Sequence, residues 1–464
     1  MLTDPAEAAG KHAAEWLNGL AERKISPNAS VDELRAAFGH GLPEGSADPA
    51  TVIAELAEDA GPGLLATASP RFFGFVVGGS LPVAVAADWL TTAWDQNAGL
   101  YALSPAASVV EEVVGAWLID LFGLPETASF GFVTGAQMAN FTALAAARNH
   151  VLAGAGWDVE ADGLTGAPPI DVILGEEHHA TIAVALRYLG LGTSSARLVR
   201  ADGQGRMQAE GFREAVSHAR GPTIVCAQAG NVNTGAFDPL GAICDAAHEK
   251  GAWVHVDGAF GLWAATAPSL RPLVDGLERA DSWAVDGHKW LNVPYDSGFV
   301  FSAHREPHRS ALTMHASYLV KSEGGRERDP ADWAPEASRR ARAFTVYAAL
   351  KSLGRTGVAE MIERCCACAR RFADALGREP GVEVLNDVVL NQVLVRFLDP
   401  EGGDHDARTR AVLHAVQEDG TCWPSGSVWK DKAVIRISVS NWATTFEDVD
   451  RSVEAIMRAA YKPA

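Results

Sequence analysis

The sequence predicts an α/β fold with a large, mostly parallel sheet domain, a small C-terminal α+β domain and an N-terminal helical arm. Residues 1–68 have helical periodicity, residues 69–345 alternate short apolar strands with amphipathic helices, and residues 346–464 open with a long helix pattern before further strands. Such alternation gives a sheet covered on both faces, and ligands bind at the carboxyl ends of its strands. We therefore expect the functional side chains directly after strands.

The individual elements follow from short segments. In the arm, "DPAEAAGKHAAEWLNGLAERK" and "SVDELRAAFG" space apolar residues three and four positions apart, and Ser30 with Glu33 forms a capping-box pattern. The predicted strands of the large domain are "SFGFVT", "IDVILG", "ARLVRA", "TIVCAQAG", "AWVHVDG", "SWAVDG" and "SGFVFSA". In the small domain the helix pattern is interrupted at Gly354, and "VEVL", "NQVLVRF" and "KAVIRISVS" are predicted strands.

The segment "KSEGGRERDPADWAPEASRR" precedes the small domain and is rich in charge, Gly and Pro. This composition predicts a mobile loop, which is either a surface linker or a functional lid.

Composition limits the possible partners. The 464 residues include 39 Lys and Arg against 58 Asp and Glu, a formal net charge of −19. Nucleic acid and anionic membrane surfaces both require a basic face, so neither is expected as a partner. The N-terminus lacks a signal-peptide pattern and the chain has no uncharged apolar run of about 18 residues, so we expect a cytoplasmic protein.

Three of the six cysteines crowd into "RCCACARR". Cys365, Cys366 and Cys368 point in different directions on the predicted helix and have no histidine at ligand spacing. We therefore expect no metal site and interpret these residues as small apolar side chains in a reducing compartment.

Two opposite charges follow consecutive apolar strands. Asp257 ends "AWVHVD", and Lys289 comes shortly after "SWAVD". A buried carboxylate is costly unless it meets a cation or hydrogen-bond donors, although an aspartate at a strand end is often only a helix cap. The spacing places both side chains near enough to share one bound group.

Two further strand ends carry complementary chemistry. In "FVTGAQMAN" the turn Thr134-Gly135-Ala136-Gln137 opens a helix, and free N–H groups with the helix dipole attract a phosphate there. The turn lacks the lysine of a P-loop and the glycines of a dinucleotide fingerprint, so ATP and NAD are poor candidates. In "GEEHHAT" a histidine after a strand is either a cap or a ring that stacks on a flat cofactor.

A phosphate cradle, a stacking ring, a carboxylate and a lysine are what pyridoxal 5′-phosphate requires. On these residues the chain resembles the fold-type-I pyridoxal-phosphate enzymes, which are aspartate-aminotransferase-like, and specifically the group II decarboxylases that include aromatic L-amino-acid and glutamate decarboxylases. The resemblance runs from "SPRFFGF" to "IRISVSNWATTFEDVDRSVEAI", and its most specific parts are "HVDGAFG", "DGHKWLNVPYDSG" and "SNW".

The resemblance implies a role for each matching residue. Lys289 matches the Schiff-base lysine, Asp257 the partner of the pyridine nitrogen and His179 the stacking histidine that assists proton transfer; these are the expected catalytic residues. The residues expected to bind the cofactor are Thr134, Gly135, Ala136, Gln137, His179, Asn231, Asn233, Asp257, Ala259, His288 and Lys289. His178 falls where the family usually has another residue, and Ala136 and Gln137 replace frequent serines or threonines, so backbone N–H groups are expected to hold the phosphate.

The resemblance also implies a substrate pocket. Phe72, Phe73 and Phe75 match a segment that walls the pocket, usually with help from a partner subunit; Tyr101 is a further candidate, and Arg342 matches an arginine near the entrance. This wall favours a hydrophobic or aromatic substrate, although three phenylalanines in four positions are equally typical of a core. A homodimer is expected.

One departure concerns the reaction. Family decarboxylases often carry a tyrosine in a mobile loop, but Asp329–Trp333 has Pro330 near that position, and Tyr318 is the nearest upstream tyrosine. We expect decarboxylation of an L-amino acid to an amine, with His179 as an alternative proton donor. The rival reactions are oxidative conversion to an aldehyde and another pyridoxal-phosphate lyase or aminotransferase activity. A scaffold without turnover is disfavoured by the intact set of Lys289, His179 and Asp257.

Overall fold

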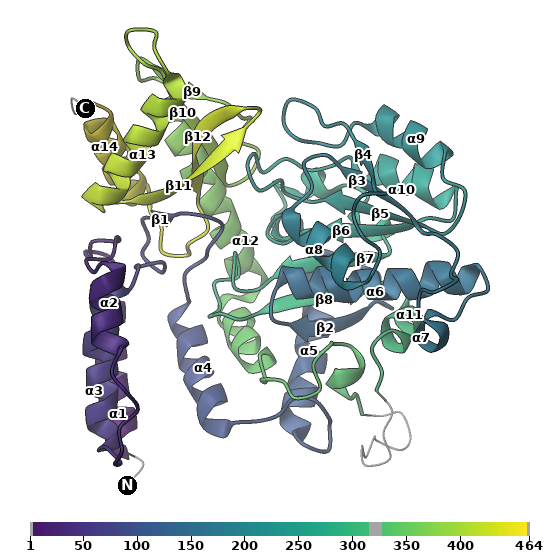
Figure 1. Cartoon of the computed structure of the whole chain (residues 1–464), viewed down its shortest axis with the longest axis horizontal. Coiled ribbons are helices and arrows are strands. Elements are labelled where there is room, and N and C mark those ends of the chain that lie inside the picture. The colour runs from purple at the N-terminus through teal and green to yellow at the C-terminus, as the bar shows by residue number, and fades with distance from the viewer. Residues whose placement is uncertain (1–2, 315–326, 462–464) are drawn as a thin grey trace. The chain divides into compact units, whose positions relative to one another are not determined.

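The computed structural model describes residues 3–314 and 327–461 (Figure 1). The chain forms two compact units. The first comprises Met1–Gly79, Arg371–Val384 and Leu394–Ala464, and the second comprises Ser80–Arg370 and Leu385–Val393. The expected domain boundaries after residues 68 and 345 stay a prediction.

The second unit contains a seven-stranded sheet with the order β2-β8-β7-β6-β5-β3-β4. Its strands are β2 (Ser129–Val133), β3 (Asp171–Gly175), β4 (Arg197–Val199), β5 (Thr223–Gln228), β6 (Trp253–Asp257), β7 (Ser282–Asp286) and β8 (Gly298–Ser302). β8 is antiparallel to both neighbours, and the other pairs are parallel. All the predicted strands of the large domain are therefore present, and β2, β3, β5, β6 and β7 end at the same edge of the sheet.

Helices precede and follow these strands. They are α4 (Pro82–Trp94), α5 (Pro105–Phe122), α6 (Ala136–Gly154), α7 (Val159–Asp162), α8 (Ala180–Tyr188), α9 (Ala209–Ser217), α10 (Leu240–His248) and α11 (Arg305–Ser310), with 3-10 turns η2 (Gly261–Thr266), η3 (Arg271–Val274), η4 (Leu277–Arg279) and η5 (Pro330–Asp332). α6 packs on β6, β7 and β8, and α10 packs on β5 and β6. Trp253, Trp283 and Trp290 are fully buried in this unit. Burial of such large rings supplies much of the hydrophobic stabilisation that holds the strand ends in place.

The first unit combines the N-terminal helices with the C-terminal strands. Its elements are α1 (Thr3–Gly19), α2 (Val31–Phe38), α3 (Pro49–Ala60), η1 (Gly61–Gly63), β1 (Phe72–Phe73), β9 (Val382–Val384), most of β10 (Gln392–Phe397), α13 (His405–Asp419), β11 (Trp423–Trp429), β12 (Lys432–Ser438) and α14 (Phe446–Tyr461). The sheet order is β1-β11-β12-β10-β9. The predicted capping box is confirmed, since Ser30 Oγ accepts from Glu33 N–H and Glu33 accepts from Ser30 N–H.

The long helix α12 (Ala343–Leu376) is interrupted at Gly354, as the sequence predicts. Gly354 has φ 63° and ψ 178°, a backbone conformation that disfavours residues with a Cβ. None of the helices in the described ranges is long and apolar enough to span a bilayer.

A buried histidine links α11 to the sheet and should make stability depend on pH. His308 Nδ1 lies 2.9 Å from Ser129 Oγ, and its Nε2 lies 3.1 Å from the carbonyl oxygen of Trp333. Burial lowers the pKa of His308 from 6.5 to about 3. The native ring therefore stays neutral in a range where the same ring in the unfolded chain binds a proton.

We expect the free energy of unfolding to fall as the pH decreases from 6.5 toward 3. Each such histidine changes the free energy of unfolding by up to roughly 1.4 kcal/mol per pH unit between its folded and unfolded pKa values. The stability it contributes is fully present above the pKa of the unfolded chain and is lost as the pH falls toward the pKa of the folded state. His255, whose pKa burial lowers to about 4, acts in the same direction. Asp238, whose pKa burial raises to about 6, opposes them. Urea titrations across this range should show a shallower pH dependence in His308→Gln, and an unchanged slope would contradict the assignment.

Candidate active site

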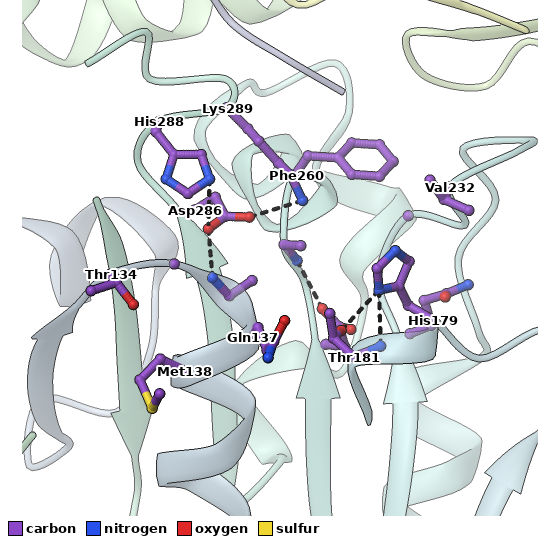
Figure 2. Close-up of a pocket in the computed structure, with 16 residues that line it drawn as sticks. Thr134, Gln137, Met138, His179, Thr181, Val232, Phe260, Asp286, His288 and Lys289 are labelled. Carbon is purple, nitrogen blue, oxygen red and sulfur yellow. Dashed lines mark hydrogen bonds and ion pairs between the residues drawn. The ribbon is translucent and has the colours of Figure 1, made fainter. Parts of the chain in front are cut away.

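A cavity of about 430 Å³ lies at the carboxyl ends of β2, β3, β5, β6 and β7 (Figure 2). The residues that line it are Thr134, Gly135, Ala136, Gln137, Met138, His179, Thr181, Gln228, Gly230, Val232, Asp257, Ala259, Phe260, Asp286, His288 and Lys289. Most of the expected cofactor-binding residues are therefore brought together. Parallel strands achieve this because their carboxyl ends meet at one edge of the sheet.

The turn between β2 and α6 forms an anion cradle. α6 begins at Ala136 without a side-chain cap from Gly135; the Ala136 N–H donates to the carboxylate of Asp286, and Gln137 and Met138 of the first turn also line the cavity. A Cβ on Gly135 would lie 2.9 Å from His288 Cε1 and 3.1 Å from Asp286 Oδ1. The glycine therefore keeps this space open.

Asp286 connects the cradle to the lysine. Its Oδ1 accepts the N–H of Ala136 at 2.5 Å, and its Oδ2 lies 2.8 Å from Lys289 Nζ. His288 Nε2 lies 3.3 Å from Oδ1, while its Nδ1 accepts the N–H of Ser297. The proton of the neutral ring is thus on Nε2. Burial lowers the pKa of His288, and the negative charge of Asp286 partly offsets that effect.

We expect Asp286→Ala to lower the free energy of unfolding of the cofactor-free protein by about 1–3 kcal/mol, because Ala136 N–H and Lys289 lose their buried acceptor. Asp286→Asn retains an oxygen that can accept from Ala136 N–H, so its free energy of unfolding should fall by less. Urea denaturation of both variants checks this order, and equal losses would show that the backbone contact is not what stabilises the turn.

Asp257 lines the cavity at the end of β6. It is the last residue of β6 and is paired in register with Gln228 of β5 and Ala284 of β7. Its Oδ1 accepts the N–H of Ala259 at 3.2 Å, and its side chain is almost fully buried. The neighbouring strands therefore fix the position of this carboxylate.

His179 caps α8 and borders the cavity. Its Nδ1 accepts the N–H of Thr181 and lies 2.8 Å from Thr181 Oγ1, so a neutral ring carries its proton on Nε2. His179 therefore acts as a helix cap, and its stacking on a flat cofactor stays a prediction. The adjacent His178 instead contacts the carbonyl oxygen of Gly175 through Nδ1, at 2.8 Å.

Other expected site residues lie outside the lining of this cavity. Asn231 Oδ1 accepts the N–H groups of Asn233 and Thr234, which shapes the loop that presents Val232 to the cavity. Arg342 Nε lies 2.7 Å from Asp296 Oδ1. For these residues the structure shows support of neighbouring loops, and their contacts with cofactor or substrate stay a prediction.

The three expected wall residues belong to the first unit. Phe72 stacks on Trp423 with ring centroids 5.2 Å apart, and Phe73 packs edge-on against Phe372 at 5.0 Å. Both are buried, whereas the Phe75 side chain is 57% exposed. Phe72 and Phe73 thus form core contacts, and a role of Phe75 in the substrate wall stays a prediction.

The described end of the predicted loop is docked on the second unit. Glu111 of α5, which is buried, pairs with Arg328 at 3.0 Å and with Arg339 at 2.8 Å. Two guanidinium groups around one buried carboxylate hold both ends of residues 328–339. Residues 328–339 are therefore anchored at both ends in this structure, and the mobility of the loop stays a prediction.

Pro330 lies within this docked segment. It is buried in η5, Asp329 Oδ1 accepts the N–H of Tyr101 at 2.9 Å, and Ala331 N–H donates to the carbonyl oxygen of Gly99. Tyr101 thus contributes its backbone to loop docking. Tyr318 lies outside the described residues.

Sequence reasoning missed several residues of the site. Asp286 was visible as an acidic residue at a strand end, three positions before Lys289, by the same criterion that singled out Asp257. Thr181, Gln228 and Phe260 carry no comparable signal, because their types are common at strand and helix ends and only the fold brings them to the cavity.

Solved structures show the same fold. The rice (Oryza sativa) TDC structure with PLP and tryptamine aligns with a TM-score of 0.92 at 23% identity, covering 99% of this chain and 97% of that one. Mouse CSAD aligns with a TM-score of 0.90 at 23% identity, covering 99% of both chains. These likenesses define a fold-type-I architecture.

The sequence defines the family. Residues 33–398 match the family model described as "Pyridoxal-dependent decarboxylase conserved domain", so the chain belongs to the pyridoxal-dependent decarboxylase family. An aromatic-L-amino-acid decarboxylase of Bacillus atrophaeus is 27% identical over 94% of this chain and 90% of its own length. The acidic amino acid decarboxylase GADL1 of Bos taurus is 29% identical, covering 76% of this chain and 69% of its own. The protein is therefore a pyridoxal-phosphate-dependent amino-acid decarboxylase.

The residues of the cavity fit this cofactor. The start of α6, where Ala136 N–H already donates to a carboxylate oxygen, and the space beside Gly135 suit a phosphate, Lys289 supplies a primary amine, and Asp257 supplies an acceptor for a pyridine N–H. The chemical requirements of the cofactor are thus met by groups that lie in one cavity.

Proposed function

We propose that the chain decarboxylates an L-amino acid with an aromatic or large hydrophobic side chain to the amine and carbon dioxide. The observation that carries this proposal is the placement of Lys289, Asp257 and the start of α6 in one cavity. When bound, pyridoxal phosphate supplies an electron sink for the pair released as the carboxylate bond breaks.

The proposed roles follow from the contacts of each residue. Lys289 would hold the cofactor through its amine, and Asp257 would accept a hydrogen bond from the pyridine N–H. His179 has its Nδ1 engaged with Thr181, so its Nε2 is the atom that would deliver a proton to the substrate carbon. The N–H groups of the α6 turn and His288 would hold the phosphate.

The proposed substrate class rests on the lining and on the relatives. Met138, Val232 and Phe260 add apolar surface to the cavity, which favours an apolar substrate side chain. The similar proteins include the aromatic-L-amino-acid decarboxylase of Bacillus atrophaeus and a tryptophan decarboxylase of Oryza sativa that is 28% identical over 90% of this chain. GADL1 represents the competing acidic class.

A substrate panel tests this proposal. The protein loaded with pyridoxal phosphate should release carbon dioxide and amine faster from L-tryptophan, L-tyrosine or L-phenylalanine than from L-glutamate or L-aspartate. One additional aromatic ring in an apolar pocket predicts a preference of at least about tenfold. A preference for the acidic amino acids would overturn the substrate class while leaving decarboxylation intact.

A second product is proposed on the basis of Pro330. This residue stands near the position of the family's loop tyrosine and is buried in η5. Without that acid, the substrate carbon can be oxidised by dioxygen: amino acid, O2 and water give aldehyde, carbon dioxide, ammonia and hydrogen peroxide. Hydrogen peroxide and aldehyde in stoichiometric amounts would establish this route, and amine without peroxide would exclude it.

We further propose a homodimer in a reducing, cytoplasmic environment. Trp89, Leu90 and Trp94 of α4 are each about half exposed, and a second copy would cover such apolar surface. All six cysteines lie within the described residues, where they are buried and form no disulfide. Light scattering on the purified protein tests the dimer, and a monomer at micromolar concentration would contradict it.

A further inference from the structure

A chain of buried hydrogen bonds extends behind Asp257. Trp253 Nε1 donates to Ser282 Oγ at 2.9 Å, and Ser282 Oγ lies 2.9 Å from His255 Nδ1. His255 Nε2 lies 2.8 Å from Asn140 Oδ1, and Asn140 Nδ2 lies 3.2 Å from Asp257 Oδ2. All members of this chain are buried.

The two ends of the chain determine its direction. The indole of Trp253 can only donate, and the carboxylate of Asp257 accepts. Asn140 must therefore turn its amide N–H toward Asp257 and its oxygen toward His255. This orientation requires the proton of His255 on Nε2, which leaves Nδ1 to accept from the hydroxyl of Ser282. Each donor meets one acceptor, so the pattern is self-consistent.

Asn140 has a second contact with the site. Its Nδ2 lies 3.4 Å from Thr181 Oγ1, and Thr181 Oγ1 lies 2.8 Å from His179 Nδ1. The two amide hydrogens of Asn140 can thus serve both Asp257 and Thr181. A flipped amide would lose both contacts and would place its oxygen against the carboxylate of Asp257.

The neutral state of His255 supports this arrangement. The ring is fully buried, and burial lowers its pKa to about 4 although the nearby charge of Asp257 acts in the opposite direction. A neutral imidazole exists as one of two tautomers, and only the tautomer with the proton on Nε2 can donate to Asn140.

We propose that His255 and Asn140 are positioning residues: neutral His255 locks the amide of Asn140 so that it directs one N–H to Asp257 and the other to Thr181. The pair thereby orients the carboxylate that meets the pyridine nitrogen and, through Thr181, the ring of His179. This inference rests on the proposed role of Asp257 and concerns residues that do not touch the cofactor themselves.

The first test needs no cofactor. Nitrogen-15 spectra of the cofactor-free protein with labelled histidine should show one ring that stays in the Nε2-protonated tautomer from neutral pH down to about pH 5 and that is absent in His255→Gln. A ring at this position protonated on Nδ1, or charged at neutral pH, would overturn the proposal.

The second test compares matched variants loaded with pyridoxal phosphate labelled with nitrogen-15 in its ring. His255→Leu removes the donor to Asn140, whereas His255→Gln keeps an N–H near the same place. We expect His255→Leu to shift the signal of the pyridine nitrogen toward the unprotonated form and to lower kcat about tenfold with a small change in KM, the size expected when Asn140, no longer held by His255, loses its hydrogen bond to the charged Asp257. His255→Gln should keep most of the parent protein's pyridine nitrogen signal and most of its kcat.

The controls separate the possible failures. His414→Leu, at an exposed position of α13, should match the parent protein in both readouts. If Asp257→Asn leaves the ring nitrogen signal unchanged, the proposed role of Asp257 fails. If Asp257→Asn shifts the signal but His255→Leu does not, only the positioning role fails. If His255→Leu does not fold, the tautomer of His255 measured in the parent protein still tests the positioning role.

Discussion

Replacement of Lys289 by alanine should abolish the visible absorbance of the protein purified with pyridoxal phosphate. The amine of Lys289 lies in the cavity, 2.8 Å from Asp286, and is the proposed covalent anchor of the cofactor. Its loss should lower the rate of carbon dioxide release by at least about 10³-fold, because the cofactor is no longer held and activated by an amine. Absorbance spectra and single-turnover assays measure the two effects.

The matched control is Lys250→Ala, which changes an exposed lysine of the same unit. This variant should keep both the absorbance and the rate of the parent protein. Retention of the visible band in Lys289→Ala, in a protein with the parent's unfolding midpoint, would show that another amine anchors the cofactor.

Replacement of Asp257 by asparagine should have the second-largest effect. Its carboxylate is held by Ala259 and Asn140 at the end of β6, and it is the proposed partner of the pyridine nitrogen. Without the negative charge the cofactor becomes a weaker electron sink. Loss of one buried electrostatic contact predicts a fall in kcat of about 10²–10³-fold.

Cofactor binding should weaken less than kcat in this variant, because the phosphate and the lysine still hold the cofactor. Asp275→Asn, at an exposed position, is the control and should behave as the parent protein. A kcat within a factor of about two of the parent, with the cofactor bound, would place the electron-sink partner elsewhere.

The strands of the large sheet could be predicted because each is a short, nearly continuous apolar run. β2, β3, β5, β6 and β7 all read in this way, and their common edge then follows from parallel pairing. Lys289, Asp257 and the turn at Ala136 were predicted for the same reason: each lies at the end of such a run or within three residues after it.

The rest of the fold carries weaker signals. β11 (Trp423–Trp429) contains Pro424 and Gly426, which are typical of turns, so only its pairing with β12 reveals the strand. The docking of residues 327–340 depends on Glu111, which lies more than two hundred positions earlier in the sequence. No local pattern indicates a contact of that kind.

The supporting residues of the site were missed for a related reason. Asn140 and His255 lie inside a helix and a strand whose apolar patterns dominate the local sequence. Their importance appears only when β6 and α6 are placed side by side, since His255 then meets Asn140 at 2.8 Å. Long-range polar pairs of this kind require the three-dimensional structure.

The most direct test of the account identifies the lysine that carries the cofactor. Protein incubated with pyridoxal phosphate, reduced with borohydride, digested and analysed by mass spectrometry should carry the added pyridoxyl phosphate mass on the peptide that contains Lys289. Lys289→Ala should yield no modified peptide at that position. Stoichiometric modification of a different lysine in the parent protein would contradict the proposed site.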